Sequence, residues 1–141
     1  MKKYLSIAVV FMLLISNACK KETPIIPPEP TKSINGNWKI IKALRNGTDL
    51  TSRFNFNNFR ISFTDSTYAL SNPVPFIVSK DGTWSFDDPV YPFRMTFKTA
   101  GGADAGSTIQ YPVVKGVRNI VISFSPGCTK NTYQYTLQQA D

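Results

Sequence analysis

The residues best placed to do chemistry in this sequence are three aspartates, Asp81, Asp87 and Asp88, which flank a short predicted strand. Paired carboxylates that meet across a hairpin could bind Ca²⁺ or act on a glycosidic bond. The same residues also suit turns, since Asp81 precedes Gly82 and the other two precede Pro89. We prefer the turn interpretation, which leaves the chain without a carboxylate site.

The residue types that perform most acid–base and nucleophilic catalysis are missing after residue 33. The sequence has no histidine, and its two glutamates, Glu22 and Glu29, both precede that point. Neither a Ser-His-Asp nor a Cys-His arrangement can therefore be built. Cys128 is the one soft metal ligand in that part of the sequence, so the usual zinc sites fail as well. We expect no catalytic residue, no metal and no cofactor, and hence no enzyme.

The two cysteines have different surroundings in the sequence. Cys19 follows Ala18 at the end of the first apolar run, whereas Cys128 follows Pro126 and Gly127. If Cys19 is modified, Cys128 has no partner and no disulfide framework exists. We expect Cys128 to be a half-buried, unreactive thiol.

Residues 1–18 have the organisation of a signal peptide. Lys2 and Lys3 give it a positive start, and the apolar run over residues 4–15 is shorter than the roughly 20 residues that a membrane-spanning helix needs. Ala18 directly before Cys19 resembles a bacterial lipobox, in which the cysteine is acylated and becomes the mature N-terminus. Such boxes with a polar residue at the position of Ser16 are similar to those of Bacteroidota lipoproteins.

The resemblance implies a palmitate-type lipid anchor at Cys19, membrane attachment, and a place in the cell envelope as an outer-membrane lipoprotein, periplasmic or surface-facing. An ordinary signal peptide that happens to hold a cysteine is the alternative. Residues 19–32 predict a tether, because four prolines lie within residues 24–30 and favour an extended chain. From residue 20 to 31 it could reach about 35–40 Å at about 3 Å per residue. It would hold a folded domain, residues 33–141, clear of the membrane.

The folded part predicts strands. Apolar and aromatic residues alternate with polar ones in four stretches, a pattern typical of half-buried antiparallel strands: residues 59–64, 93–98, 120–124 and 132–138. Weaker strands are expected at residues 38–44, 67–70, 76–78, 83–86 and 109–113, and only residues 49–55 could hold a short helix. This many short strands favours an all-β fold, either a small antiparallel up-and-down β-barrel of about eight strands or a flattened barrel or sandwich.

Turn residues separate these strands. Residues 80–82, Lys-Asp-Gly, predict a tight hairpin in which the glycine adopts a positive φ, and residues 115–116 predict another. Residues 46–47, Asn-Gly, end the first strand, and residues 99–107 form a polar, glycine-rich loop tip.

One motif resembles that of a known family. Gly36-Asn37-Trp38 opens the first strand and is similar to the Gly-x-Trp of lipocalins, in which the tryptophan closes one end of the barrel. Residues 36–137 also resemble the lipocalin-like domains of uncharacterised Bacteroidota lipoproteins. The resemblance implies a barrel that holds a small ligand. The family's Thr-Asp-Tyr turn is missing, and no arginine lies in the last strand to pack over Trp38.

Two functions remain open. One is a non-catalytic binding module for a small apolar or amphiphilic ligand or a glycan; the other is a structural or protein-interaction module of the envelope with a filled barrel and no small ligand. Alternation alone predicts the inward residues that would line a ligand site: Trp38, Phe63, Trp84, Phe93 and Phe97. Tyr91 is expected to face outward. Ten phenylalanines and two tryptophans favour a mostly filled interior.

Two further expectations concern the surface. Asp65-Ser66-Thr67 resembles the Asp-Ser/Thr-x acceptor for O-glycans on exported Bacteroidota proteins, which implies O-glycosylation of Ser66; a plain polar turn is the alternative. The net charge of +7 is spread along the chain without a basic run, so we expect no nucleic-acid partner. The sequence does not predict an oligomeric state.

Overall fold

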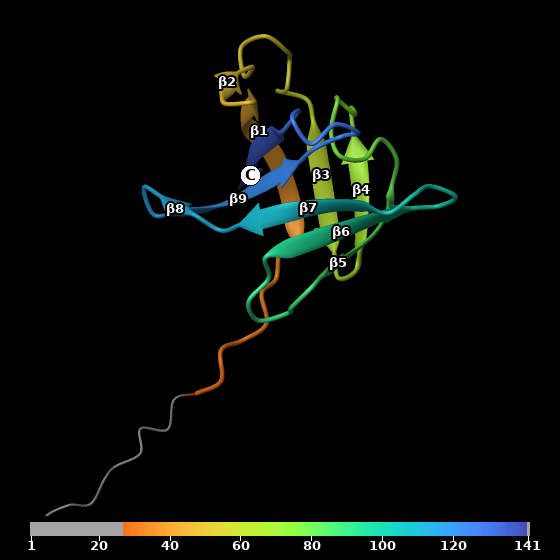
Figure 1. The fold of residues 1–141 in the computed structure, drawn as a ribbon. Coiled ribbons are helices and arrows are strands. Elements are labelled where there is room, and N and C mark those ends of the chain that lie inside the picture. Colours follow the sequence, from red (N-terminus) through yellow and green to blue (C-terminus); the bar gives the residue numbers. More distant parts are fainter. Residues whose placement is uncertain (1–26, 141) are drawn as a thin grey trace, which may run out of the picture.

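The computed structural model describes residues 27–140 and places them in a closed antiparallel β-barrel (Figure 1). Eight strands form the barrel in chain order: β1 (Gly36–Arg45), β3 (Arg60–Thr64), β4 (Thr67–Ser71), β5 (Gly82–Phe86), β6 (Arg94–Thr99), β7 (Ala105–Gln110), β9 (Val117–Phe124) and β10 (Tyr133–Gln139). Two short additional strands are β2 (Thr48–Asp49), beside β1, and β8 (Val113–Val114), beside β9.

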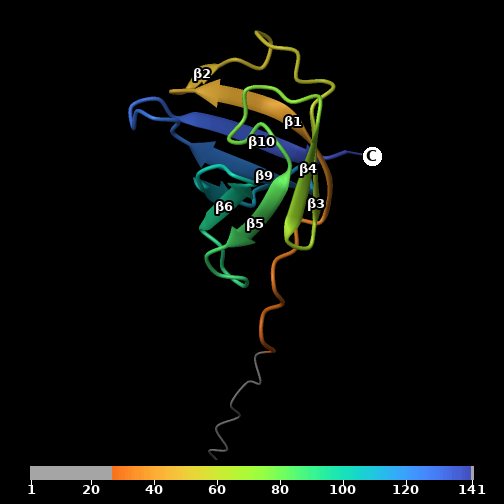
Figure 2. The same cartoon turned by 90° about the vertical axis from the view of Figure 1, so that its right-hand side faces the viewer.

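Each barrel strand pairs with the next one along the chain, and β10 pairs with both β9 and β1. Each of the eight strands therefore has a hydrogen-bonded neighbour on both sides. The predicted all-β, up-and-down barrel is therefore confirmed, and the flattened barrel or sandwich is not what forms. Figure 2 shows β1, β10 and β9 side by side and crossing the direction of β3 and β4, as the twist of a small barrel requires. Across residues 27–140, no helix has the length and apolar character needed to cross a membrane.

The hairpin predicted at residues 115–116 is confirmed by backbone angles, and residues 46–47, which were predicted to end the first strand, form a turn of the same kind. Asn46 and Gly47 join β1 to β2 with φ of 49° and 80°, and Lys115 and Gly116 join β8 to β9 with φ of 52° and 79°. Positive φ at both central residues is the type I′ turn, whose twist matches that of the flanking strands.

The predicted hairpin at residues 80–82 is wrong. Gly82 is the first residue of β5, and residues 72–81 connect it to β4 across one end of the barrel. The glycine is needed for another reason: a Cβ at this position would collide with the main-chain carbonyl of Lys98 on β6. The sequence pattern could not separate a turn glycine from one that permits close approach of two strands.

The predicted strand at residues 76–78 is also wrong. Pro73 and Pro75 lack the N–H that a ladder needs, and the apolar residues after them turn inward instead. The ring of Phe76 packs against Phe59 and Phe97, with centroids 5.2 and 6.3 Å away. The 72–81 segment therefore covers this end of the barrel, which we call the mouth.

Three other boundaries differ from those predicted. The predicted helix at residues 49–55 is absent: Asp49 ends β2, turns follow, and the amide of Arg53 donates to the carbonyl of Leu50 at 2.9 Å. The loop expected at 99–107 is shorter, since β7 begins at Ala105. The strand expected at 109–113 is interrupted between β7 and β8.

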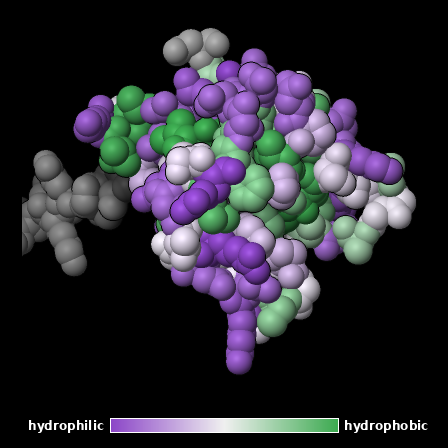
Figure 3. Space-filling view, turned by 90° about the horizontal axis from the view of Figure 1, so that it is seen from above, coloured by the Kyte–Doolittle hydropathy of each residue, from purple (hydrophilic) through white to green (hydrophobic). Residues whose placement is uncertain are grey.

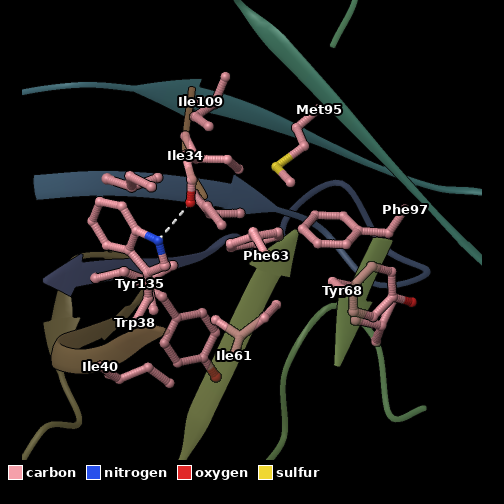
Figure 4. Packing of buried hydrophobic residues seen from close by; sticks show 14 of the residues in the cluster. Ile34, Trp38, Ile40, Ile61, Phe63, Tyr68, Met95, Phe97, Ile109 and Tyr135 are labelled. Carbon is pink, nitrogen blue, oxygen red and sulfur yellow. Dashed lines mark hydrogen bonds between the residues drawn. The ribbon is translucent and has the colours of Figure 1, made fainter. Parts of the chain in front are cut away.

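The barrel interior is filled by inward-facing side chains in one continuous cluster (Figure 4). Rings meet across the axis: Phe63 lies 5.6 Å from Trp84 and 6.4 Å from Phe97, measured between centroids. At the end opposite the mouth, the indole nitrogen of Trp38 donates to the carbonyl of Ile34 at 2.8 Å, which ties the chain before β1 to the core (Figure 4). We call this opposite end the base.

A bulge in β1 interrupts the period-two alternation of a regular strand. The register with β10 shifts between Ile40 and Lys42, so Ile40 and Ala43 are both buried while Ile41 is partly exposed. The hydroxyl oxygen of Thr51 accepts the amide of Ala43 at 3.0 Å and supports this local geometry.

Candidate functional site

Four of the five predicted lining residues are buried in the direction that alternation indicated. Trp38, Phe63 and Phe97 are almost fully enclosed, and Trp84 nearly so. They contact neighbouring side chains of the core cluster instead of bordering an open cup. Their observed role is to fill the barrel, so the place for a ligand has to be sought elsewhere.

Phe93 is a correction: it points outward and is 73% exposed. One carboxylate oxygen of Asp87 accepts the amides of both Phe93 and Arg94, at 3.1 and 3.0 Å. In a regular strand the amides of successive residues point to opposite sides. Here the amides of Phe93 and Arg94 both point to Asp87, so the alternation of inward and outward side chains is broken at Phe93. The inward series of β6 therefore begins at Met95, and Phe93 cannot line the interior.

An open cleft of about 390 Å³ lies at the mouth. Side chains from four regions line it: the 72–81 segment, the start of β7, the end of β9 and the start of β10. Its volume falls in the range of small-molecule sites. Figure 3 shows the molecule from above the view of Figure 1. On this face, hydrophobic residues, coloured green, lie between hydrophilic residues, coloured purple.

One wall of this mouth cleft is a set of three nearly parallel aromatic rings. Phe124 lies 5.8 Å from Tyr133 and 5.8 Å from Tyr135, with interplanar angles of 15° and 20°. Tyr133 pairs with Phe124 across β10 and β9, and Tyr135 is two residues further along β10 on the same face. The regular strand pairing therefore sets the spacing of the rings.

A second cleft of about 250 Å³ adjoins the first and shares Pro75, Tyr133 and Tyr135 with it. Its other lining residues come from β1 and the 50–56 turns and are mostly apolar: Arg45, Leu50, Phe54 and Phe56. The guanidinium carbon of Arg45 lies 5.6 Å from the centroid of the Tyr133 ring, a cation–π arrangement. The Tyr133 and Tyr135 side chains thus separate two halves of one mouth.

Several polar groups at the mouth are held by hydrogen bonds or by an ion pair. Tyr135 donates its hydroxyl hydrogen to the carbonyl of Pro75, and burial raises the pKa of Tyr135 to about 12, so it is a neutral donor at ordinary pH. The hydroxyl groups of Ser125 and Thr132 are hydrogen-bonded, with 3.2 Å between their oxygen atoms. Asp104 forms a 3.2 Å ion pair with Lys98 of β6. An apolar wall with a few placed polar groups suits an amphiphilic ligand better than a purely apolar one.

The predicted alternative of a carboxylate site finds no support. Asp81 and Asp87 stand at opposite ends of β5, about 20 Å apart at about 3.3 Å per residue. Asp88 accepts the amides of Val90 and Tyr91 at 2.7 and 2.8 Å, which is the turn role expected. The amide of Arg94, with that of its neighbour in the chain, holds the pKa of Asp87 below its usual value. Among residues 27–140 no three His, Cys, Asp or Glu side chains gather as a metal site would require.

The remaining predicted positions lie apart from the clefts. Ser66 is exposed in the β3–β4 turn, and its carbonyl accepts the amide of Trp84 at 2.8 Å. Cys128 is exposed in the β9–β10 loop, so the expectation of a half-buried thiol was wrong. Tyr91 faces outward as expected. The acylation predicted at Cys19 and the signal peptide of residues 1–18 lie outside the described residues.

Sequence reasoning missed Tyr133, Phe124 and Phe76 as residues of the mouth. Their strand pattern was recognised for β9 and β10, but alternation does not say how far along the barrel axis a side chain lies. One signal was present: Tyr133 and Phe124 both flank the 125–132 loop, and residues next to a loop lie at a barrel end.

Comparison with known proteins identifies one family. A family model described as "Domain of unknown function (DUF5004)" matches residues 16–138. No curated protein and no solved structure matches the chain.

Proposed function

The chain belongs to the DUF5004 family, a family of domains of unknown function, and we propose that its barrel is a non-catalytic binding module that holds a small amphiphilic ligand, such as a sugar ring of a glycan, at its mouth. The observation that carries the proposal is the set of three near-parallel rings at an open cleft of about 390 Å³, of which Phe124 and Tyr133 are half-buried and can meet a ligand, whereas Tyr135 is buried. A sugar ring has a C–H-rich face that packs on an aromatic ring and hydroxyl groups that need polar partners.

We further propose that acylation of Cys19 anchors this protein to the cell envelope as an outer-membrane lipoprotein. The support is the order of a basic start, a short apolar run and a small residue before the cysteine. The Cys19→Ala variant should lose the acyl mass in intact-mass measurement and move from the detergent phase to the aqueous phase. An unchanged mass and unchanged partitioning would contradict the anchor.

Binding is tested by native mass spectrometry of protein purified from its own membrane, followed by titration with oligosaccharide and lipid panels. Tyr133→Ala removes one ring of the wall and should weaken binding of any ligand found by tenfold or more. Tyr91→Ala is the matched control, because Tyr91 is an exposed tyrosine at the base, away from both clefts. Equal affinities of the two variants would place the ligand outside the mouth.

A filled interior favours one other function, that of a structural or protein-interaction module of the envelope with no small ligand. The rings that meet across the barrel axis are the observation behind it. Absence of any adduct and of any binding in the panels, together with a protein partner recovered by cross-linking at the mouth, would favour this second function over the first.

A further inference from the structure

Exposed apolar side chains are concentrated at the base. Seven large hydrophobic residues are exposed among residues 27–140, and five of these lie on two connections, residues 87–93 and the β8–β9 hairpin. They are between 43% and 73% exposed: Tyr91, Phe93, Val113, Val114 and Val117. We call these five residues the base face. Large apolar side chains exposed together at one end of a protein are typical of an interaction site.

The two connections are neighbours. The carbonyl of Phe93 accepts the amide of Ile109 at 3.0 Å, so the 87–93 connection lies beside the end of β7. A shallow depression is bordered by Phe93 and Tyr111, and Tyr111 lies two residues before β8. The amide of Asn119 donates to the carbonyl of Pro112 at 2.9 Å and ties the connection between β7 and β8 to β9. Both loops of the base face are therefore next to the end of β7, at the same end of the barrel.

The N-terminal part of the chain leaves the barrel at the same place. The amide of Lys32 donates to the carbonyl of Pro89, between β5 and β6, at 2.7 Å. Figure 1 shows the coloured segment ahead of β1, from residue 27 on, beside the β5–β6 connection. Cys19 precedes Lys32 by 13 residues, which span at most about 40 Å at about 3 Å per residue. Any membrane that holds Cys19 must therefore lie within about 40 Å of Lys32, which is beside the base face.

The composition of the base face suits a lipid surface. Lys115 and Arg118 flank the exposed valines of the hairpin, and basic residues beside apolar ones are typical of surfaces that lie in the headgroup region. Tyrosine is enriched at membrane interfaces because its ring is apolar and its hydroxyl polar. The two acidic groups here, Asp87 and Asp88, accept main-chain amides and carry as much charge as Lys115 and Arg118. The exposed apolar side chains are therefore the main attraction to lipid.

We propose that the base face rests on the lipid bilayer and orients the barrel with its mouth away from the membrane. This proposal rests on the proposed acylation of Cys19 in one respect only: the anchor keeps the barrel close to a bilayer. Acylation is read separately, from the intact mass of the same sample, so failure of the anchor and failure of the orientation can be told apart.

The test compares fluorescent labels at the two ends of the barrel. The acylated protein is placed in vesicles of phosphatidylethanolamine with a minority of phosphatidylglycerol, some lipids carrying brominated chains that quench fluorescence. One sample carries an environment-sensitive thiol label on native Cys128, in the loop beside the mouth. The other carries it at Phe93→Cys in a Cys128→Ser background, and peptide mapping confirms a single labelled position.

We expect a blue shift and strong quenching at position 93 and neither at position 128. Val114→Asp, at an exposed site of the base face, should reduce the quenching at position 93 severalfold. Phe54→Asp, at an equally exposed site of the mouth, should leave it unchanged. Equal quenching at both positions, or none at either, would overturn the proposal. The proposal would also be overturned if position 93 formed thiol cross-links to a second copy or to another protein and showed no quenching by the brominated lipid.

Discussion

The hydroxyl of Tyr135 on β10 donates a hydrogen bond to the main-chain carbonyl of Pro75, 60 positions earlier in the chain. This bond links the last strand of the barrel to the 72–81 segment that covers the mouth. The ring of Phe76 packs 5.4 Å from the ring of the same tyrosine, so one side chain holds the segment by both polar and apolar contact.

Tyr135→Phe should loosen the cover over the mouth. Phenylalanine keeps the ring but cannot donate, so the Pro75 carbonyl loses its partner. We expect the free energy of unfolding to fall by about 1 kcal/mol, measured by urea titration, and amide hydrogen exchange to accelerate within residues 72–81. Tyr91→Phe, at an exposed position, is the control and should change neither. Unaltered exchange in the segment would show that apolar packing alone holds it.

Stability should decline at alkaline pH because of the same side chain. Burial raises the pKa of Tyr135 to about 12, whereas a tyrosine of the unfolded chain ionises near 10. Above pH 10 the unfolded state loses this proton first, so the contribution is complete below about pH 10 and is lost as pH rises toward about 12. Urea midpoints at about pH 9 and about pH 11 measure the loss.

The matched variant for this pH effect is again Tyr135→Phe. Its decline over the same interval should be shallower than that of the unaltered protein. Part of the decline should remain, because burial also raises the pKa of Tyr111. Identical slopes in the two proteins would mean that Tyr135 does not titrate in this range.

Trp38 should contribute far more to stability than an exposed aromatic residue. Trp38→Ala removes a buried indole from the base of the core, and such truncations cost about 3–5 kcal/mol. Phe93→Ala, at a residue that is largely exposed, should cost less than about 1 kcal/mol. Urea melts followed by far-UV circular dichroism measure both, and similar costs would contradict the placement of these two rings.

Two glycines of the sheet should respond differently to an added methyl group. Gly82→Ala brings a Cβ against the carbonyl of Lys98, and because backbone cannot move aside cheaply we expect a loss of about 1–3 kcal/mol. Gly106→Ala meets nothing within 4 Å and should change stability by no more than about 0.5 kcal/mol. Thermal or urea unfolding of the two variants measures these losses. If Gly82→Ala were as stable as the unaltered protein, β5 and β6 would have to move apart to make room for the methyl group.

Most of the fold followed from alternation, and its failures have local causes. The β10 pattern predicted the buried Tyr135 and Leu137 correctly, because that strand is regular along its length. The inward series failed at Phe93, where Asp87 binds two successive amides. The bulge after Ile40 in β1 is another local departure from period two. Both depend on contacts between residues that a period-two pattern does not include.

The mouth was less predictable than the barrel. The apolar residues around Phe76 suggested a strand, since a short apolar run fits a strand and a packed loop equally well. The rings of Phe124 and Tyr133 were placed on strands but not at one end, because their position along the axis depends on the register of closure. The candidate site forms only when the barrel closes and brings the ends of distant strands together. The local sequence therefore says little about where the site is.

The closing strand has a consequence for how the protein must be made. β10 is the last strand of the chain and pairs with both β9 and β1, with partners as distant as Trp38 and Gln139. β10 is synthesised after the other strands of the barrel, so β1 and β9 each keep a bare hydrogen-bonding edge until β10 has been made. Such edges pair readily with other chains, so a protein truncated before Tyr133 should aggregate instead of closing the barrel. Loss of β10 would therefore cost this protein two strand pairings at once.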